Sequence, residues 1–389
     1  MSEERSRNNF DVIIIGAGSI GVPSAYFLAK GGFKVLVIES MPSVGQASNK
    51  HAIGGIRATH SDLAKIHLGK RSLEIFSNWE KQHGDNIEWY KGGYSFLAYD
   101  AENERVLKEL TEWQSLHALN ISWLDKQELL AIIPNLKQEN LIGGTYSPDD
   151  GSASPLKAAF SFFQRSKDYQ AMYRFNESVI AFKANGNKVI GVKTDKGEYY
   201  SNWVINAAGG WADTLSAKLG VHVPVIPDSH EAAITEPVAR LFHPMFVDMR
   251  PFPGSANFYF YQHPTGKIIF CMTPEPTIPG IHTITSGGFL PKAARRLIEI
   301  LPVLKHIRVR RVWRGVYPMT PDGSPIIGEV AGLDGYILAV GMCGQGFMFG
   351  PGVGKLLTQM LLGQLDESDI MALNRLSYQR EFKSIEMLK

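Results

Sequence analysis

A glycine-rich turn between two short apolar runs constrains this chain more than any other feature. Residues 11–15 (DVIII) predict a buried parallel strand, and they lead directly into the GAGSIG segment at 16–21. An apolar-periodic helix follows, and a second strand over 34–38 ends on Glu39. In this order the glycines permit a tight turn, the approach of a pyrophosphate and close helix–strand packing. The sequence therefore predicts a dinucleotide site, with Glu39 accepting ribose hydroxyls.

Length and composition bound what surrounds this site. With 389 residues the chain favours two domains, and 40 basic against 38 acidic residues give a net charge of +2. This balance predicts neither a nucleic-acid-binding nor a membrane surface. The two cysteines, Cys271 and Cys343, lie in no CxxC pair or Cys/His cluster, so we expect no disulfide framework and no metal site. The polar start MSEERSRNNF is not a secretory signal, and no apolar run approaches the ~18 residues of a spanning helix, which favours a cytoplasmic enzyme.

Two further small-residue segments follow predicted strands. Residues 204–212 (VINAAGGWA) permit either close contact with a ligand or simple tight packing. The segment 341–350 contains four glycines and precedes a helix through Leu362, with Pro351 expected in its first turn. Such a loop suits a flat ligand, and the helix dipole would stabilise the negative charge of a reduced isoalloxazine.

The middle of the chain alternates between strands and helices and includes the aromatic series 258–261 (FYFY). Strand alternation places Phe258 and Phe260 on one face, with Tyr259 and Tyr261 on the other. Such a strand is usually part of a core. Without further context, Arg57 in the small-residue loop 40–60 is expected to be a solvated surface charge.

The motifs GAGSIG (16–21), GGIR (54–57), VINAAGGWA (204–212), PDGSPIIG (321–328) and GMCGQGFMFGPGVG (341–354) together resemble the D-amino-acid oxidase superfamily. The similarity is greatest to the glycine/sarcosine oxidase group and to the β-subunits of sarcosine oxidase and proline dehydrogenase. It implies FAD, an α/β doubly wound Rossmann-like FAD-binding domain, and an α+β substrate domain with an antiparallel sheet. The implied reaction is oxidation of the C–N bond of a small, secondary or N-methyl amino acid to an imine.

With this resemblance we expect a discontinuous FAD-binding domain over 10–90, 146–220 and 316–380, and a substrate domain over 91–145 and 221–315. The resemblance also implies a set of site residues. Those expected to bind the cofactor are Gly16, Gly18, Ser19, Ile20, Gly21, Glu39, Ser40, Ser48, His51, Ala52, Val179, Ala208, Gly209, Trp211, Gly344, Gln345, Gly346, Phe347 and Met348. Those expected at the substrate are Arg57, Tyr259, Tyr317 and Met348.

The chain departs from the family pattern at the substrate. Glycine oxidases place a carboxylate-binding arginine where this chain has Tyr317, and monomeric sarcosine oxidases place a lysine where it has Met348. The substrate carboxylate would then rest mainly on Arg57, whose planar guanidinium suits a bidentate pair, with tyrosine hydroxyls helping.

Other departures concern the flavin. Gly315 stands where sarcosine oxidases carry a flavin-linked cysteine, so we expect no such bond. The segment SNKHAIG (48–54) resembles the histidine tether of dimethylglycine and sarcosine dehydrogenases, so His51 is a candidate for a covalent link, with a non-covalent contact as the alternative. Lys267 is out of register with the lysine that promotes oxygen reaction, which favours a dehydrogenase that passes electrons to a partner protein or carrier.

Two alternatives remain open. One is an FAD-dependent 2-hydroxy-acid dehydrogenase, which would need a base such as His51, His60 or His263. The other is a non-catalytic, flavin-carrying subunit of an electron-transfer complex.

Overall fold

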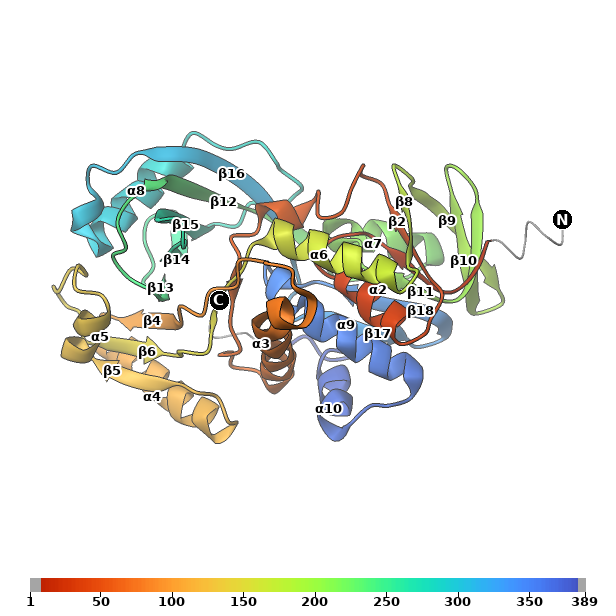
Figure 1. The fold of residues 1–389 in the computed structure, drawn as a ribbon, viewed down its shortest axis with the longest axis horizontal. Helices are drawn as coiled ribbons and strands as arrows, with labels where there is room; N and C mark the ends of the chain where they lie inside the picture. Colours follow the sequence, from red (N-terminus) through yellow and green to blue (C-terminus); the bar gives the residue numbers. More distant parts are fainter. Residues whose placement is uncertain (1–7, 384–389) are drawn as a thin grey trace.

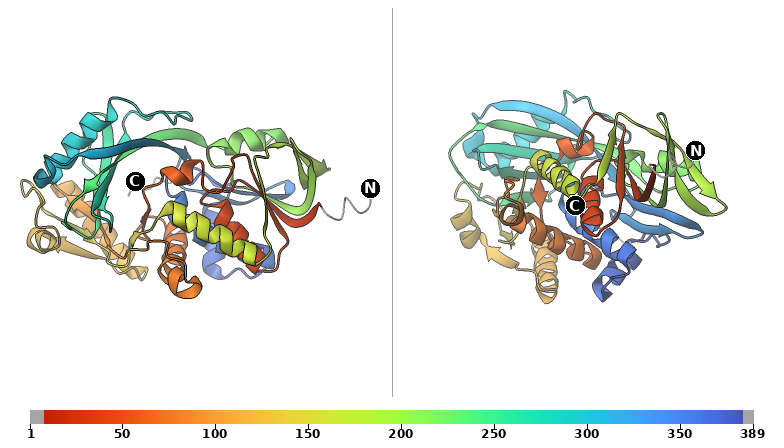
Figure 2. Two further views of the ribbon diagram at one scale, coloured as in Figure 1. Left: turned by 45° about the horizontal axis from the view of Figure 1, so that its top comes forward. Right: turned by 45° about the vertical axis from the view of Figure 1, so that its right-hand side comes forward.

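The computed structural model describes residues 8–383, and the first seven residues of the polar N-terminal segment lie outside this range. Two eight-stranded sheets form two lobes that lie side by side (Figure 1) and stay distinct in the rotated views (Figure 2). The first sheet has the order β17-β18-β10-β11-β1-β2-β8, with β9 paired to β10. Its strands are β1 (Asn9–Ile15), β2 (Val35–Glu39), β8 (Met172–Phe175), β9 (Val179–Asn185), β10 (Lys188–Thr194), β11 (Glu198–Asn206), β17 (Ile326–Val330) and β18 (Leu333–Val340).

The centre of this sheet is parallel. Strand β1 pairs in parallel with both β2 and β11, β2 pairs with β8, and β11 pairs with β18. Parallel strands are covered on their faces, which explains why β1 and β2 read as nearly continuous apolar runs. The short strand β8 was not predicted, because its four residues, MYRF, carry no apolar run.

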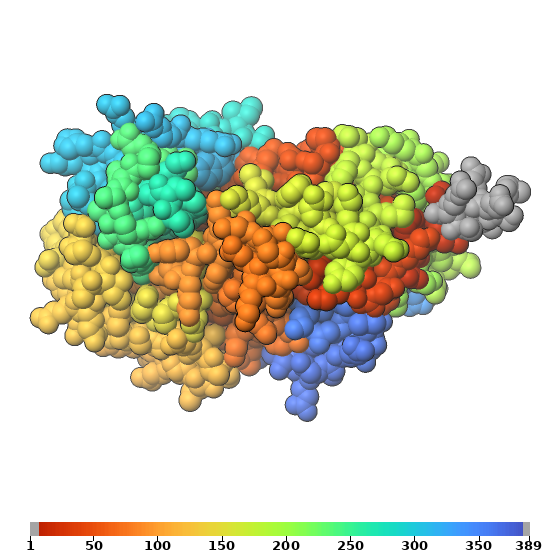
Figure 3. Space-filling view, viewed as in Figure 1, coloured from red at the N-terminus to blue at the C-terminus, as the bar shows by residue number. Residues whose placement is uncertain are grey.

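Helices α2 (Gly21–Lys30), α3 (Leu63–His83), α6 (Pro155–Asp168) and α9 (Gly346–Leu362) pack around this sheet, and α10 (Glu367–Arg375) packs on α3. Helix α3 begins where the Asp62 side chain accepts the amides of Ala64 and Lys65, and it ends at Gly84 in the left-handed region. Helix α6 crosses the surface in Figure 3, with Phe162 buried and Phe160 55% exposed. Among the described residues, no helix combines the length and hydrophobicity needed to cross a bilayer.

The start of α9 corrects one prediction. The helix begins at Gly346, so Pro351 lies in its interior and not in its first turn. The proline removes one helical hydrogen bond, but the helix is held by very close packing. A Cβ at Gly350 would lie 2.0 Å from the Ser19 carbonyl oxygen, and one at Gly352 would lie 2.5 Å from that of Leu68. Part of the expected glycine loop is therefore helical.

The second sheet has the order β16-β12-β15-β14-β13-β4-β6-β5. It is antiparallel as expected, except that β13 and β4 pair in parallel. Its strands are β4 (Tyr94–Ala98), β5 (Ser122–Asp125), β6 (Gly143–Tyr146), β12 (Ile226–Pro237), β13 (Met245–Asp248), β14 (Ser255–Gln262), β15 (Lys267–Pro274) and β16 (Val309–Met319).

The aromatic strand β14 alternates as predicted. Phe258 and Phe260 are fully buried in a core with helix α8 (Phe289–Ile300) and helix α5 (Lys126–Ile132). Tyr259 and Tyr261 belong to the opposite face, where helix α4 (Ala101–Leu116) contributes to the core. On this face Tyr259 is available to a site between the lobes, whereas Tyr261 is buried and donates its hydroxyl to the Ile53 carbonyl oxygen.

Candidate active site

A cavity of about 510 Å³ lies between the two sheets. One wall consists of residues at or just beyond the carboxyl ends of β1, β2, β11 and β18. The other wall consists of residues of the second sheet, from β4, β12, β13, β14, β15 and β16. Ligands of parallel sheets bind at the carboxyl ends of the strands, so this cavity is the expected site.

All but one of the predicted site residues line this cavity. Those lining it are Gly16, Gly18, Ser19, Ile20, Glu39, Ser40, Ser48, His51, Ala52, Arg57, Val179, Ala208, Gly209, Trp211, Tyr259, Tyr317, Gly344, Gln345, Gly346, Phe347 and Met348. Gly21 does not line it. A Cβ at Gly21 would lie 1.8 Å from the Gly16 carbonyl oxygen, so this glycine permits the close contact between turn and helix.

One end of the cavity fits the pyrophosphate and ribose of a dinucleotide. Gly16 has φ +106°, and a Cβ there would lie 2.6 Å from the Ala207 carbonyl oxygen. A Cβ at Gly18 would meet no atom within 4 Å, so the backbone stays open to a ligand at this position. Helix α2 begins without a side-chain cap, which leaves amide groups for an anion. Glu39 accepts the amide of Ala17 at 2.7 Å, which fixes the carboxylate beside this turn.

The other end fits the flavin ring. The loop before α9 contains Gly344 at φ +80°, where a Cβ would lie 2.2 Å from the Tyr317 ring. Helix α9 also begins without a side-chain cap, at Gln345, whose buried Oε1 has no hydrogen-bond partner among the described residues. An uncapped helix end beside a flat glycine loop suits the pyrimidine edge of the ring, where reduction adds negative charge.

Two tyrosines from different strands meet in the cavity. The hydroxyl oxygens of Tyr259 and Tyr317 are 2.8 Å apart. Burial raises the pKa of both phenols, so both stay protonated at neutral pH. Cys271 on β15 lies behind them, and burial raises the pKa of its thiol to about 12 against opposing hydrogen bonds from the two hydroxyls. The pair therefore presents neutral hydroxyl groups.

Arg57 lines the cavity although its side chain is only 5% exposed. Its guanidinium donates from Nη1 to the Thr59 carbonyl oxygen, and its Cζ lies 5.2 Å from the centre of the Phe96 ring. These contacts exclude the solvated surface position that the sequence favours without the family resemblance.

His230 also lines the cavity, and our sequence analysis missed it. Its ring is stacked on Tyr317, and its Nε2 lies 3.1 Å from Asp228 Oδ2. Its Nδ1 is buried and has no hydrogen-bond partner in the described part of the chain. Burial opposes ionisation of Asp228, but hydrogen bonds from His230 and from two backbone amides outweigh it and lower the pKa of this carboxyl. The strand expected from sequence covered only residues 232–235, whereas β12 spans Ile226–Pro237. The missed signal was the D-S-H spacing just before that expected strand, which on a strand places acid and imidazole on one face.

The other histidines considered from sequence differ in position. His51 lines the cavity, its buried Nδ1 has no partner among residues 8–383, and burial lowers its pKa. A Cβ at Gly315 would lie 2.8 Å from the His51 Cβ, so a cysteine there would displace the histidine. His60 is fully buried against Phe349, and neither His60 nor His263 lines the cavity.

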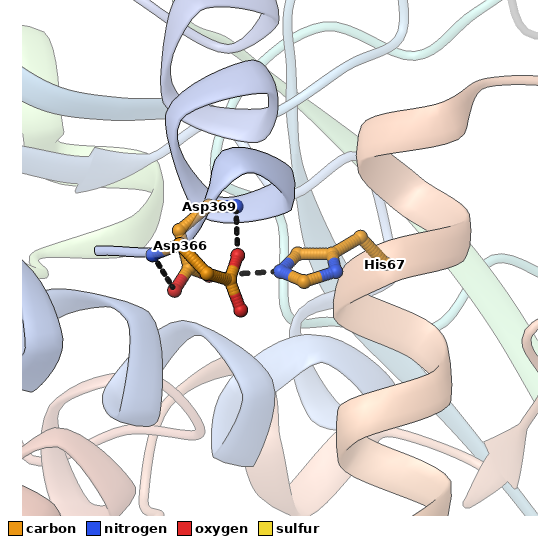
Figure 4. A group of neighbouring side chains, drawn as sticks. All are labelled: His67, Asp366 and Asp369. Atoms are coloured by element: carbon orange, nitrogen blue, oxygen red, sulfur yellow. Dashed lines mark hydrogen bonds and ion pairs between the residues drawn. The ribbon is translucent and has the colours of Figure 1, made fainter. Parts of the chain in front are cut away.

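A group of potential metal ligands lies outside the cavity. His67 on α3 faces Asp369 of α10, with Asp366 beside it (Figure 4). Arg71 pairs with both carboxylates, and Asp366 caps α10 through the amide of Asp369. Both carboxylates are already paired with Arg71, and Asp369 also contacts His67, so these contacts are explained as docking of α10 on α3.

Comparison with known proteins agrees with this geometry. The model of the family "FAD dependent oxidoreductase" (DAO) matches residues 11–360. The crystal structure of L-proline dehydrogenase from P. horikoshii superposes with a TM-score of 0.89 and 30% identity, over 96% of this chain and 98% of that one.

Two curated relatives are more distant. Mitochondrial dimethylglycine dehydrogenase from Homo sapiens is 24% identical over 96% of this chain, which spans only 45% of that protein. Hydrogen cyanide synthase subunit HcnC from Pseudomonas protegens is 25% identical over 91% of this chain and 92% of its own length. The predicted superfamily and the predicted cofactor are confirmed: this chain is a member of the DAO family of FAD-dependent oxidoreductases.

Proposed function

We propose that this oxidoreductase oxidises the C–N bond of a small amino acid, secondary or N-methylated, to an imine. The observation that carries this proposal is the convergence on one cavity of a cation, two neutral hydroxyls and an imidazole: Arg57, Tyr259, Tyr317 and His230. A zwitterionic amino acid offers a carboxylate to the cation and an ammonium to the imidazole. The names of dimethylglycine dehydrogenase and L-proline dehydrogenase support this substrate class.

FAD held between the glycine turn after β1 and the loop before α9 would supply the hydride acceptor for this oxidation. Arg57 binds the carboxylate in a bidentate pair, and the tyrosine pair, in which one hydroxyl donates to the other, donates its remaining O–H to it. The substrate nitrogen must be unprotonated, because its lone pair forms the C=N bond as the hydride leaves. His230 is placed to accept the ammonium proton on Nδ1, while Asp228 holds Nε2–H and stabilises the resulting imidazolium.

An anaerobic absorbance titration of the purified flavoprotein tests this function. The panel comprises sarcosine, proline, hydroxyproline, glycine, D-alanine and, as the hydroxy-acid control, 2-hydroxyglutarate. We expect one secondary amino acid to bleach the flavin band. Bleaching by the hydroxy acid alone would establish the 2-hydroxy-acid dehydrogenase alternative. No bleaching by any compound would favour a flavin-carrying subunit, for which the similarity to a subunit of hydrogen cyanide synthase is the specific observation.

We further propose that the enzyme is a dehydrogenase that passes electrons to a protein or small carrier. The oxygen-promoting lysine of the related sarcosine oxidases has no counterpart in register here, and Lys267, which is near that position in the sequence, is not among the residues that line the cavity. Reduced enzyme mixed with air-saturated buffer should therefore reoxidise slowly, and an artificial acceptor such as a phenazine should reoxidise it quickly. Fast formation of hydrogen peroxide in step with substrate oxidation would contradict this proposal.

The domain division is also a proposal. We infer a Rossmann-like FAD-binding domain around the first sheet and a substrate domain around the second, with the bounds expected from sequence. The bounds at 145/146 and 315/316 fall inside strands β6 and β16, so limited shifts there are expected. A cytoplasmic location stays a prediction, supported by the free thiols of Cys271 and Cys343.

A further inference from the structure

Arg57 does not hold its position through its own strand alone. It directly follows β3 (Gly55–Ile56), a strand of two residues whose only ladder within residues 8–383 is with β7 (Gly151–Ser152). Beyond this short ladder, the chain turns so that the Thr59 carbonyl oxygen accepts a hydrogen bond from the Arg57 guanidinium. The direction of the guanidinium therefore depends on the conformation of residues 58 and 59.

Asp150 lies beside this turn because of strand pairing. In the antiparallel ladder, Ile56 is opposite Gly151, so the next positions outward are Arg57 and Asp150. The Asp150 side chain is 2% exposed, and its charge interacts with that of Arg57.

The Asp150 carboxylate holds both residues that follow Arg57. Its Oδ1 accepts the amide of Ala58 at 3.0 Å, and its Oδ2 accepts the Thr59 hydroxyl at 2.9 Å. Oδ2 also accepts the Ser147 hydroxyl at 2.6 Å, which fixes the carboxylate from its own segment. Thr59, one of the two residues held in this way, also supplies the carbonyl oxygen that accepts the hydrogen bond from the Arg57 guanidinium.

We propose that Asp150 is a positioning residue, which holds residues 58–59 so that Arg57 presents its guanidinium to the carboxylate of the substrate. This inference rests on the proposed function, because it takes Arg57 as the carboxylate anchor. Geometry matters for such an anchor, since a bidentate pair requires both N–H groups to meet both oxygens in one plane. A guanidinium whose turn is loosened keeps its charge but loses this alignment.

The surroundings of Asp150 account for its ability to do this. Burial raises its pKa to about 6, opposed by hydrogen bonds from Ser147, Ala58 and Thr59 and by the charge of Arg57, so it is ionised at neutral pH. The other titratable group near the pair is the buried Tyr94 phenol, whose pKa is raised by burial. Hydrogen bonds to an ionised acceptor are stronger than neutral ones, which suits a group that must fix a turn.

The test measures binding, not turnover, in holoenzyme with bound FAD at pH 8. The probes are pyrrole-2-carboxylate and its amide, which have similar shape but differ in charge, and binding is followed by perturbation of the flavin absorbance. Asp150→Ala should weaken binding of the carboxylate by about 10-fold or more and leave binding of the amide unchanged. Asp150→Asn, which can still accept from Ala58 and bond both hydroxyls, should recover most of this loss.

Two further variants keep the proposal open to refutation if Asp150→Ala fails to fold. Thr59→Val removes one of the hydrogen bonds and should weaken carboxylate binding by about 3-fold. Asp149→Ala is the matched control, because this neighbouring acid is exposed and pairs only with Lys91 and Asn120 among the contacts described, and it should change nothing. In the double variant Arg57→Gln/Asp150→Ala, loss of Asp150 should add nothing to loss of Arg57.

Equal loss of both probes in Asp150→Ala, or unchanged carboxylate binding in Asp150→Ala and Thr59→Val, would overturn the positioning role. A wild-type protein that binds acid and amide equally would overturn it too, because Arg57 would then anchor no carboxylate. Failure of the proposed function looks different: the wild type would prefer the carboxylate, yet no amino acid would bleach its flavin.

Discussion

The imidazole ring of His230 lies on the phenol ring of Tyr317, with ring centres 3.8 Å apart and planes inclined by 16°. The two residues are diagonal neighbours on the paired strands β12 and β16, where Tyr317 is opposite Asp228 and His230 is opposite Gly315. The stack leaves His230 with one nitrogen bound to Asp228 and one without a partner among the described residues. The ring is fixed in place and among residues 8–383 only its Nε2 is hydrogen-bonded, so its Nδ1 is well placed for proton transfer.

His230→Gln should therefore slow anaerobic flavin reduction by about 100-fold at neutral pH, the usual size of a general-base effect. The pH profile should change as well. In the variant the substrate ammonium loses its proton only to solvent, and this loss becomes more complete as the pH rises. The rate of flavin reduction in the variant should therefore keep rising at a pH where that of the wild type has reached a plateau. His282→Gln, in an exposed loop, is the control. Parallel pH profiles for wild type and His230→Gln would rule out proton transfer to this ring.

The tyrosine pair gives a second prediction. Because the pKa of both phenols is raised by burial, neither should ionise below pH 10, and their role is to donate hydrogen bonds. Tyr259→Phe or Tyr317→Phe should raise KM by about 5-fold, the value of one neutral hydrogen bond, with a smaller effect on kcat. Tyr378→Phe, which changes an exposed hydroxyl, serves as control. A rate that depends on ionisation of either phenol between pH 7 and pH 9 would contradict this reading.

The cofactor cradle could be predicted from sequence because its parts are consecutive. The strand, the glycine turn, the helix and Glu39 follow one another within residues 9–39, so local spacing carries the information. The same is true of the turn after β11 and the glycines before α9. In this region the prediction failed only where tertiary packing determines the start of a helix. Pro351 lies inside α9 because the helix is held by contacts with α2 and α3.

The substrate side could be predicted only in part, because it is assembled by strand pairing between distant segments. Arg57 and Tyr259 were found through resemblance, but nothing local marks Asp150 as the neighbour of Arg57. Their contact depends on the pairing of β3 with β7. The place of His230 in the site likewise depends on the pairing of β12 with β16, which brings Tyr317 over its ring.

Gly344 offers a steric prediction. Gly344→Ala would place a methyl group 2.2 Å from the Tyr317 ring and would also strain a backbone at φ +80°. We expect the variant to lose most of its bound FAD, because the loop must move away from the flavin position. Gly363→Ala is a matched control, since it has φ +67° but its Cβ would meet no atom within 4 Å. FAD content should fall only in Gly344→Ala. Equal FAD content in the two variants would show that the loop tolerates the displacement.

The alternatives for His51 lead to a prediction about the flavin bond. The His51 carbonyl oxygen accepts the Trp313 indole at 2.8 Å, and its ring lies half-buried at the cavity. We expect a non-covalent contact, so precipitation of the holoenzyme with acid should release all FAD into solution. His51→Ala should then bind FAD more weakly without changing the mass of the denatured chain by more than the substitution. A yellow precipitate would establish the covalent link instead. So would a denatured wild-type chain that is heavier by the mass of one FAD, if His51→Ala abolishes this extra mass.

Asp150 should also make stability depend on pH. Its pKa is raised from 3.8 to about 6 in the folded protein, chiefly by burial, so the folded state binds the proton more tightly than the unfolded state. Below pH 3.8 both states are protonated and no cost arises. Between pH 3.8 and 6 this carboxyl is ionised in the unfolded state but still protonated in the folded state, so the free energy of unfolding should fall by about 2 kcal/mol between pH 4 and pH 7.

Asp150→Asn removes this titration, because an amide does not ionise. The urea midpoint of the variant minus that of the wild type should therefore increase as the pH rises from 4 to 7, whatever this difference is at pH 4. Asp149→Asn, at an exposed carboxylate, supplies the control for a general change of charge. Curves for Asp150→Asn and wild type that stay parallel over this range would mean that the folded protein does not hold a proton on Asp150.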